Sequence, residues 1–293
     1  MTIWCKMKRV RLLEIHEQSW CPTAIRHGVR DGLFTIWKLF FWKNALPHLQ
    51  DLLSHSKSPR LVDLCSGGGG PVPLVLEELN RSHPEIEVLL TDWYPKSNWV
   101  NPMGQNDSLT YHRQSVDAKN VPEHLGDCRT LFEAFHHFSP AEAQGILADA
   151  VRSQKPIAIF EFQRASFWKC LTSFPLNIAV LFGAYGQLWH TQFSWKKLLF
   201  TLIPIIPAIL VIDGLVSVWR TYSTSELAQL AKRAGADNFR WEVRQSEDCG
   251  WGIMTCLIGW PDADGGVFLI PYPSGVSTAQ SPQRTQPRLS ASK

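Results

Sequence analysis

The sequence lacks the marks of several common protein classes. Its seven cysteines are scattered, odd in number and include no Cys-x-x-Cys pair, which argues against a zinc site or a disulfide framework and fits a reducing compartment. Residues 1–20 hold no apolar core of signal-peptide length, and the chain shows no internal repeat. We therefore expect a cytoplasmic protein and predict no metal site.

An excess of positive charge is also lacking before the C-terminal segment. The net charge is +3, and the segment after Asp264 holds Arg284, Arg288 and Lys293 without any acidic residue. The remainder of the chain is therefore near neutral, and it lacks the broad basic surface that nucleic acids require. We predict no nucleic-acid partner.

Apolar residues, in contrast, are plentiful. Hydrophobic residues make up 45% of the chain and charged residues 19%, proportions that support a sizeable core over most of its length. The 13 tryptophans suit an apolar cleft or a membrane interface as well as ordinary core packing. Residues 271–293, which are rich in Ser, Pro, Gln and Thr, are predicted to form a disordered tail.

Short apolar runs alternate with helical patterns between residues 59 and 262. This alternation predicts a parallel sheet with right-handed crossover helices. The predicted strands are 60–65, 86–91, 109–113, 130–135, 157–162, 239–243 and 253–260, and the predicted helices are 73–80, 140–153 and 223–235. In the last helix, Ser223 and Glu226 have capping-box spacing and Gly235 is a natural end.

Residues 1–58 are predicted to form an N-terminal helical cap. Apolar residues recur at helical spacing across 23–55, and Pro47 is expected to mark a kink or a new helix start. The cap either covers a ligand pocket or packs as an ordinary helix.

An apolar helical insertion is predicted at residues 166–218. No charged residue occurs between Lys169 and Lys196, and a second apolar run follows at 198–212. This run has 15 residues and two prolines, whereas a spanning helix needs about 20 residues. A membrane hairpin and additional core over the sheet are alternatives, but we favour a lid over an acceptor site or a shallow contact with a membrane surface.

The segment that carries most chemical information is Val62–Gly70, with the sequence VDLCSGGGG. Its glycines allow positive φ and close approach of the backbone to a ligand, and the following helix offers N–H donors. No Gly-Lys-Ser/Thr follows, so the segment is not a P-loop. Asp92 ends the next strand, where an acid either accepts hydrogen bonds from ribose hydroxyls or caps a turn.

These residues resemble the class I S-adenosylmethionine-dependent methyltransferase family, whose first motif reads Asp/Glu-x-Gly-x-Gly-x-Gly. Asp63, Cys65, Gly67 and Gly69 take its positions, with Cys65 in place of the first glycine. The resemblance implies that Asp63 and the glycine backbone hold the methionine moiety of S-adenosyl-L-methionine, and that Asp92 binds its ribose.

The resemblance extends to the third and fourth strands. It implies that Asp117 hydrogen-bonds to the adenine amine and that Val116 flanks the adenine ring. The segment EAFHHF at 133–138 resembles the family's motif after the fourth strand, so Phe135 is counted among the cofactor-binding residues.

The family resemblance also implies the architecture. We expect a doubly wound, mostly parallel α/β sheet of seven strands, the Rossmann-like methyltransferase fold. Residues 59–165 and 219–262 would form the cofactor-binding domain. A nicotinamide-dependent oxidoreductase shares the Gly turn and the acid of the second strand, but Asp117, the adjacent histidines and the lack of a Tyr-x-x-x-Lys pair argue against it.

The histidines at positions 136 and 137 are the candidate catalytic residues. Methyl transfer is an in-line displacement from a sulfonium, for which the protein mainly positions the acceptor and excludes water. An alcohol, phenol or activated carbon acceptor needs a base, and His136 and His137 follow the fourth strand near the expected sulfonium. Alternatively, they shape the pocket. Further candidates are Glu133, Glu161, His190 and Asp213.

Two functions remain open. The first is a methyltransferase that acts on a small hydrophobic acceptor, such as a lipid, a quinone-like ring or a polyketide-like product. The second is a non-catalytic methyltransferase-like scaffold that associates with a membrane or a partner protein. The acids at positions 63, 92 and 117 favour the enzyme, because an inactive pocket has no need of all three. The sequence does not indicate an oligomeric state.

Overall fold

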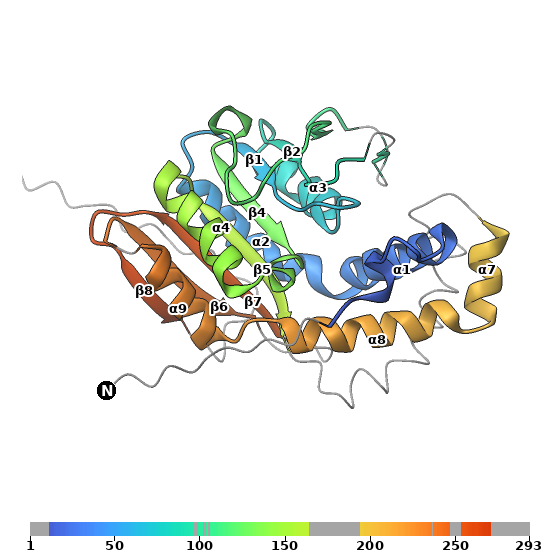
Figure 1. The fold of residues 1–293 in the computed structure, drawn as a ribbon. Coiled ribbons are helices and arrows are strands. Elements are labelled where there is room, and N and C mark those ends of the chain that lie inside the picture. Colours follow the sequence, from blue (N-terminus) through green and yellow to red (C-terminus); the bar gives the residue numbers. More distant parts are fainter. Residues whose placement is uncertain are drawn as a thin grey trace, which may run out of the picture.

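The fold is built around one eight-stranded sheet. The computed structural model describes residues 12–96, 99–101, 104, 106–163, 194–235, 237–246 and 253–270. The strands are β1 (Arg60–Asp63), β2 (Glu87–Leu90), β3 (Leu109–Tyr111), β4 (Cys128–Phe132), β5 (Ile157–Gln163), β6 (Phe239–Gln245), β7 (Ile253–Pro261) and β8 (Gly266–Ile270). Figure 1 shows this sheet with helices on both of its faces.

The strand order is β3-β2-β1-β4-β5-β7-β6-β8. The first five strands in this order pair in parallel, whereas β7 is antiparallel to both of its neighbours and β6 pairs with β8 in parallel. The order reverses beside β1, as it does in doubly wound α/β sheets. The expected mostly parallel, Rossmann-like architecture is therefore confirmed.

The sheet differs from the expected one at two places. It has an eighth strand, β8, whose five residues lie at an edge and are partly or largely exposed. The apolar run at 267–270 was its signal in the sequence and was not assigned to a strand. The fourth strand covers Cys128–Phe132 rather than 130–135. The chain leaves the strand at Glu133, where φ is 50°, and then forms a 3-10 turn at Phe135–His137.

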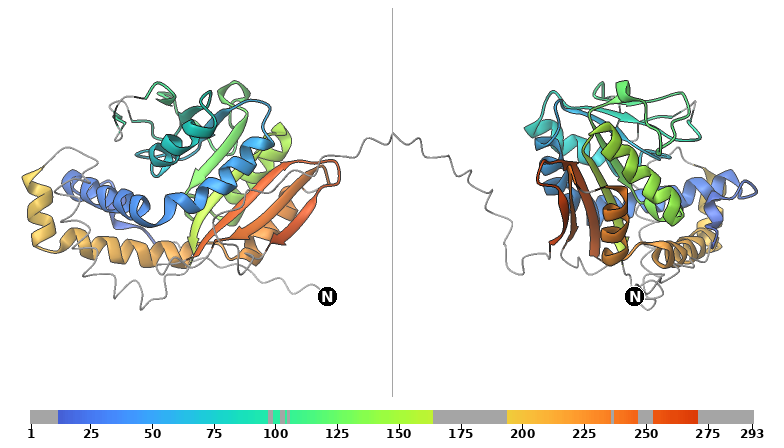
Figure 2. Two further views of the ribbon diagram at one scale, coloured as in Figure 1. Left: turned by 180° about the vertical axis from the view of Figure 1, so that it is seen from behind. Right: turned by 60° about the vertical axis from the view of Figure 1, so that its left-hand side comes forward.

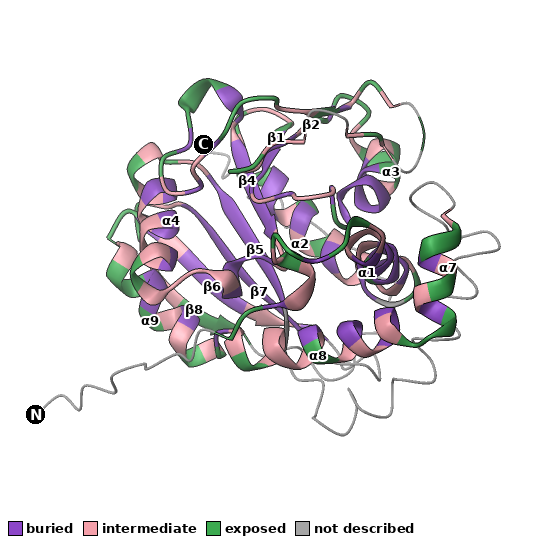
Figure 3. Cartoon of the chain, turned by 45° about the vertical axis from the view of Figure 1, so that its right-hand side comes forward, coloured by how far each residue is buried: buried purple, intermediate pink, exposed green. Residues whose placement is uncertain are grey.

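Two hydrophobic cores lie on opposite faces of the sheet. The helices α2 (Trp42–Ser54) and α3 (Val72–Ser82) cover one face, and α4 (Pro140–Ser153) and α9 (Thr224–Ala234) cover the other. Alternate residues of β5 serve the two cores: Phe160 packs on the first face and Ile159 on the second. The buried interior of the sheet is visible in Figure 3.

Local capping signals fix the helices of the second face. Ser139 and Glu142 form a capping box at α4, and Ser223 and Glu226 form the predicted one at α9. Gly235 ends α9 with φ of 123°, a backbone conformation that L side chains rarely adopt.

The irregularity in the N-terminal helical segment lies before α2 rather than at Pro47, where we expected it. Helix α1 (Thr23–Ile36) continues through a π-helical turn (Trp37–Phe41) into α2. No new helix begins at Pro47, which lies inside α2 and removes only one backbone donor there. The irregularity is the π turn, a recognised site of helix distortion.

Part of the predicted insertion forms helices that pack on α1. Residues 164–193 and the predicted tail 271–293 lie outside the described residues. The remainder forms α7 (Trp195–Leu202) and α8 (Ile205–Arg220). In both views of Figure 2, α8 runs alongside α1 at one side of the sheet. Close packing requires Gly28 on α1, because a Cβ there would overlap the Ile206 side chain.

The insertion also buries an ion pair with α1. Lys197 on α7 donates to a carboxylate oxygen of Asp31 on α1 at 2.9 Å, and both side chains are buried. Among the described helices, none by itself is long and apolar enough to cross a membrane. By length and composition alone, α7 and α8 taken together could do so, but they meet at a bend of 73°.

Candidate functional site

The glycine-rich loop follows β1 at the point where the strand order reverses. In doubly wound sheets the crevice at this point, beyond the carboxyl ends of the strands, is where ligands bind. The loop after β1 lies between β2 and β4. The loop after β4 carries the two histidines. The order of the strands therefore brings both predicted motifs to the same edge of the sheet.

Asp63 ties the ends of three strands together. Its carboxylate accepts a hydrogen bond from Thr130 Oγ1 on β4 at 2.8 Å, and its carbonyl accepts from the hydroxyls of Ser66 and Thr91. Burial raises the pKa of Asp63 to about 7, against the effect of the hydroxyl donors. The side chain therefore orders the loop from beneath, and its contact with a cofactor stays a prediction.

The loop backbone adopts left-handed conformations at several positions. The φ angles are 57° at Cys65, 54° at Gly67, 101° at Gly69 and 47° at Gly70. Cys65 thus takes the conformation that a glycine would take in its place, at a cost of about 1 kcal/mol for an L residue. No atom of the described residues lies within 4 Å of a Cβ built on Gly67 or Gly70, so open space faces the loop.

Asp92 meets the glycine loop, as the pairing of the two motifs predicts. Its Oδ2 accepts from the backbone N–H of Gly67 at 2.8 Å, and its Oδ1 accepts from that of Tyr94 at 2.8 Å. The carbonyl of Asp92 also accepts from the backbone N–H of Val116 at 3.1 Å. Three of the predicted cofactor positions are therefore in direct contact.

Two aromatic residues that the sequence analysis did not single out close one side of the loop. Trp99 Nε1 donates to the Gly68 carbonyl at 2.9 Å, and the Tyr111 hydroxyl donates to the Gly67 carbonyl at 3.2 Å. Their ring centroids lie 5.5 Å apart. The aromatic cluster just after Asp92 (DWYPKSNW) was the available signal.

Two cations accompany this aromatic pair. Burial and the nearby Arg30 lower the pKa of Lys96 to about 8, and burial also lowers the pKa of Arg30 on α1. Asp92 acts electrostatically on both cations in the opposite direction. The glycine loop is therefore bordered by positive charge from two different elements.

Val116 and Asp117 lie after β3, as expected. Val116 is buried, and Asp117 is half-buried. Asp117 Oδ1 accepts from the backbone N–H of Lys119 at 2.9 Å, so the carboxylate caps the turn. Its role toward adenine stays a prediction.

Phe135 and His136 are both held by Glu161 at the end of β5. The Glu161 Oε1 accepts from the backbone N–H of Phe135 at 2.7 Å, and its Oε2 lies 2.7 Å from His136 Nδ1. The Phe135 ring is fully buried against Tyr222, with the centroids 5.4 Å apart. The contact of Phe135 with a cofactor stays a prediction.

The two candidate catalytic histidines have opposite electrostatics. Burial alone would favour the neutral ring of His136, but Glu161 and Glu14 outweigh it and raise its pKa to about 10. Burial and the adjacent His136 lower the pKa of His137 to about 3. His136 is fully enclosed, whereas the side chain of His137 keeps 23% of its surface exposed.

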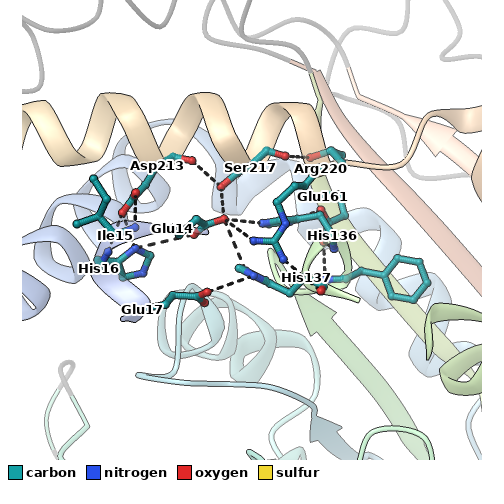
Figure 4. A network of polar contacts seen from close by, with 12 residues as sticks. Glu14, Ile15, His16, Glu17, His136, His137, Glu161, Asp213, Ser217 and Arg220 are labelled. Atoms are coloured by element: carbon teal, nitrogen blue, oxygen red, sulfur yellow. Dashed lines mark hydrogen bonds and ion pairs between the residues drawn. The ribbon is translucent and has the colours of Figure 1, made fainter. Parts of the chain in front are cut away.

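An acidic N-terminal segment that the sequence analysis missed completes this region. Glu14 Oε1 lies 3.4 Å from His136 Nε2, 4.0 Å from His137 Nε2 and 3.7 Å from Arg220 Nη1, and it accepts from the Ser217 hydroxyl at 2.8 Å. Figure 4 shows Glu14 between α8 and the histidines. The acid–histidine run Glu-Ile-His-Glu at 14–17 was the available signal.

Asp213 has a structural role here. It accepts from the backbone N–H groups of Ile15 at 2.7 Å and His16 at 3.1 Å, and it lies 2.8 Å from His16 Nδ1. It therefore anchors the N-terminal segment to α8. His190 lies outside the described residues.

Comparison with known proteins gives likenesses in structure only. No family model and no curated protein matches the sequence. The chain is similar to human N-acetylserotonin methyltransferase in complex with SAM, at 14% identity and a TM-score of 0.38, covering 81% of this chain and 65% of that chain. It is similar to PigF with SAH at 14% identity and a TM-score of 0.39, covering 78% and 66%.

A polyketide synthase domain is a third example. The CMeT domain of the citrinin polyketide synthase shares 12% identity at a TM-score of 0.44, with 77% of this chain and 53% of that chain covered. The chain thus spans about two thirds or less of the length of these three structures. Its own strand order is that of a doubly wound, Rossmann-like α/β fold.

Proposed function

We propose that this protein is an S-adenosylmethionine-dependent methyltransferase that acts on a small, hydrophobic acceptor. The observation that carries the proposal is the hydrogen bond between the Gly67 N–H and the Asp92 carboxylate. It joins the glycine loop after β1 to the acid after β2 at the point where the strand order reverses, and this is where the fold binds nucleotide-like ligands.

The residues present fit the cofactor. The space facing Gly67 and Gly70 is open, so a ligand can approach the backbone closely. Each Asp92 oxygen accepts one backbone N–H and retains a lone pair, which suits it to the ribose hydroxyls. Lys96 and Arg30 offer positive charge for the carboxylate of the methionine moiety.

The loop after β4 is the part of the site that would contact the methyl acceptor. When bound, the cofactor supplies a methyl group on a sulfonium, and the protein contributes position and exclusion of water. His137 is the histidine whose side chain remains partly exposed, so it is the one that can contact an acceptor. His136 is enclosed between Glu161 and Glu14 and acts as a positioning residue.

The insertion supports a hydrophobic acceptor at a membrane surface on the cytoplasmic side. Large apolar side chains of α7 and α8 are exposed, including Trp195, Leu202 and Trp219. Figure 3 shows the exposed outer side of α7. Co-sedimentation with phosphatidylcholine and anionic vesicles tests this contact, with a Trp195→Ser/Trp219→Ser variant as the comparison. Equal recovery of both proteins in the supernatant would favour the lid.

Cofactor binding is the first test. Calorimetric titration with S-adenosylmethionine and S-adenosylhomocysteine is expected to show micromolar binding that Asp92→Asn abolishes. Asp107→Asn is the matched control, because Asp107 is an exposed acid in the loop before β3. A folded protein that binds neither compound would contradict the enzyme and favour the scaffold.

Methyl transfer is the second test. Apolar alcohols, phenols and ring carbons are offered with radiolabelled cofactor, and transfer is followed into the organic phase. His137→Ala is expected to lower turnover and leave cofactor affinity unchanged, since His137 lies on the acceptor side. Loss of cofactor affinity in that variant would contradict this division of roles.

A further inference from the structure

Glu14, His136 and His137 bring three metal-ligating side chains together. One ligand atom from each lies within 4.8 Å of the others. His136 Nε2 and His137 Nε2 are 3.4 Å and 4.0 Å from Glu14 Oε1. Two ligands of a tetrahedral Zn²⁺ at bond lengths of about 2.0–2.1 Å lie about 3.3 Å apart. The separations are thus close to those of a coordination sphere.

The second ring nitrogen of His136 is the independent sign of a ligand. Among the described residues, Nε2 is completely buried and makes no hydrogen bond of good geometry; its polar neighbour is Glu14 Oε1 at 3.4 Å, although buried polar atoms are nearly always hydrogen-bonded. The other nitrogen, Nδ1, lies 2.7 Å from Glu161 Oε2. A histidine that donates one ring N–H to a carboxylate and directs the other nitrogen into a polar cluster has the arrangement of a metal ligand.

The net charge of the side chains around this cluster favours a bound cation. Glu14, Glu161 and Asp213 are buried carboxylates, and Arg220 is the basic residue whose guanidinium approaches Glu14. With both imidazoles neutral, as metal ligation requires, these four side chains have a net charge of −2. A divalent ion would neutralise it, whereas buried charges without compensation are costly.

We propose that Glu14, His136 and His137 bind a divalent transition-metal ion of the Zn²⁺ class, with Glu161 orienting His136. Two imidazoles and one carboxylate form a donor set that suits Zn²⁺ and its neighbours rather than Mg²⁺ or Ca²⁺. His137 and Glu17 are the partly exposed residues at this cluster, and Glu17 Oε2 is 3.5 Å from His137 Nδ1. The fourth position is therefore accessible to water or to a ligand from this side.

The ion would act on the acceptor, a consequence that rests on the proposed function. A transition-metal ion lowers the pKa of a bound hydroxyl and so prepares it as a nucleophile. His137 then serves as a ligand on the acceptor side. The binding of the ion itself is independent of the methyl transfer.

Metal binding is tested with Co²⁺, whose visible absorption reports tetrahedral nitrogen and oxygen ligands. The full chain, freed of any histidine tag and dialysed against a chelator, is titrated with Co²⁺ and then with competing Zn²⁺. We expect one ion per chain. Glu161→Gln is expected to weaken the affinity about 10–100-fold, as orienting partners do, and His137→Ala to weaken it further.

Two variants keep the test decisive. His83→Ala is the matched control, because His83 lies beyond the end of α3 and is partly exposed, and its affinity should equal that of the wild type. Glu14→Gln replaces His137→Ala if circular dichroism shows that the latter does not fold. Absence of the Co²⁺ bands in folded wild-type protein, or wild-type affinity in the ligand variants, would overturn the proposal.

Calorimetry with S-adenosylmethionine on the metal-free and metal-loaded protein separates the two proposals. Cofactor binding without metal binding would overturn only the metal site and leave the methyltransferase intact. Metal binding without cofactor binding would uphold the site and overturn the proposed function.

Discussion

The buried carboxyl group of Asp63 allows a quantitative test of the loop. Its pKa rises from 3.8 to about 7 because it is removed from water. The folded chain therefore holds this proton more tightly than the unfolded chain, and stability falls as the pH rises from about 4 to about 7. At about 1.4 kcal/mol per pKa unit, the ionisation penalty is roughly 2 kcal/mol at pH 5 and roughly 4 kcal/mol at pH 8.

Asp63→Asn isolates this penalty, because the amide is nearly isosteric and carries no charge. Its free energy of unfolding relative to the wild type should rise by about 2–3 kcal/mol between pH 5 and pH 8. Urea denaturation followed by tryptophan fluorescence at several pH values measures the difference. Asp107→Asn should show no such trend. Parallel stability curves for wild type and Asp63→Asn across this range would refute the reasoning.

Three further predictions concern a backbone conformation, a packing contact and a buried ion pair, and thermal and urea denaturation measure each of them. Cys65→Gly should leave stability unchanged or higher, because glycine adopts positive φ freely, whereas Cys65→Val should lower it. Gly259→Ala should cost about 1–3 kcal/mol, because the added Cβ overlaps the Trp241 ring; a neutral effect would contradict this packing. Lys197→Ala should cost about 3–5 kcal/mol by leaving Asp31 buried without this cation, and Asp31→Asn/Lys197→Met should recover most of that loss.

The parts of the fold that depend on local signals could be predicted from the sequence. Apolar runs predicted seven strands, and helical periodicity, with one capping box at Ser223, predicted the bounds of α4 and α9 nearly to the residue. The contact between Gly67 and Asp92 could be foreseen, because adjacent parallel strands must bring their carboxyl ends together.

The parts that depend on distant contacts could not be predicted. Glu14 meets His136 across more than a hundred residues of sequence, and nothing near either residue marks the other. The edge strand β8 is different, because its apolar run at 267–270 was a visible local signal that was not assigned to a strand. The π turn at Trp37–Phe41 is a packing-dependent irregularity inside a regular helical pattern, whereas Pro47, the visible local signal, is accommodated within α2.

The anchoring of the N-terminal segment to α8 by Asp213 bears on how such a protein can diversify. The glycine loop, Asp92 and Asp117 come from one contiguous stretch of chain, whereas the polar cluster at His136 and His137 also draws on Glu14 and α8, which flank that stretch in sequence. Under the proposed function, changes in these flanking segments would alter the acceptor side of the site and leave the glycine loop and Asp92 unchanged.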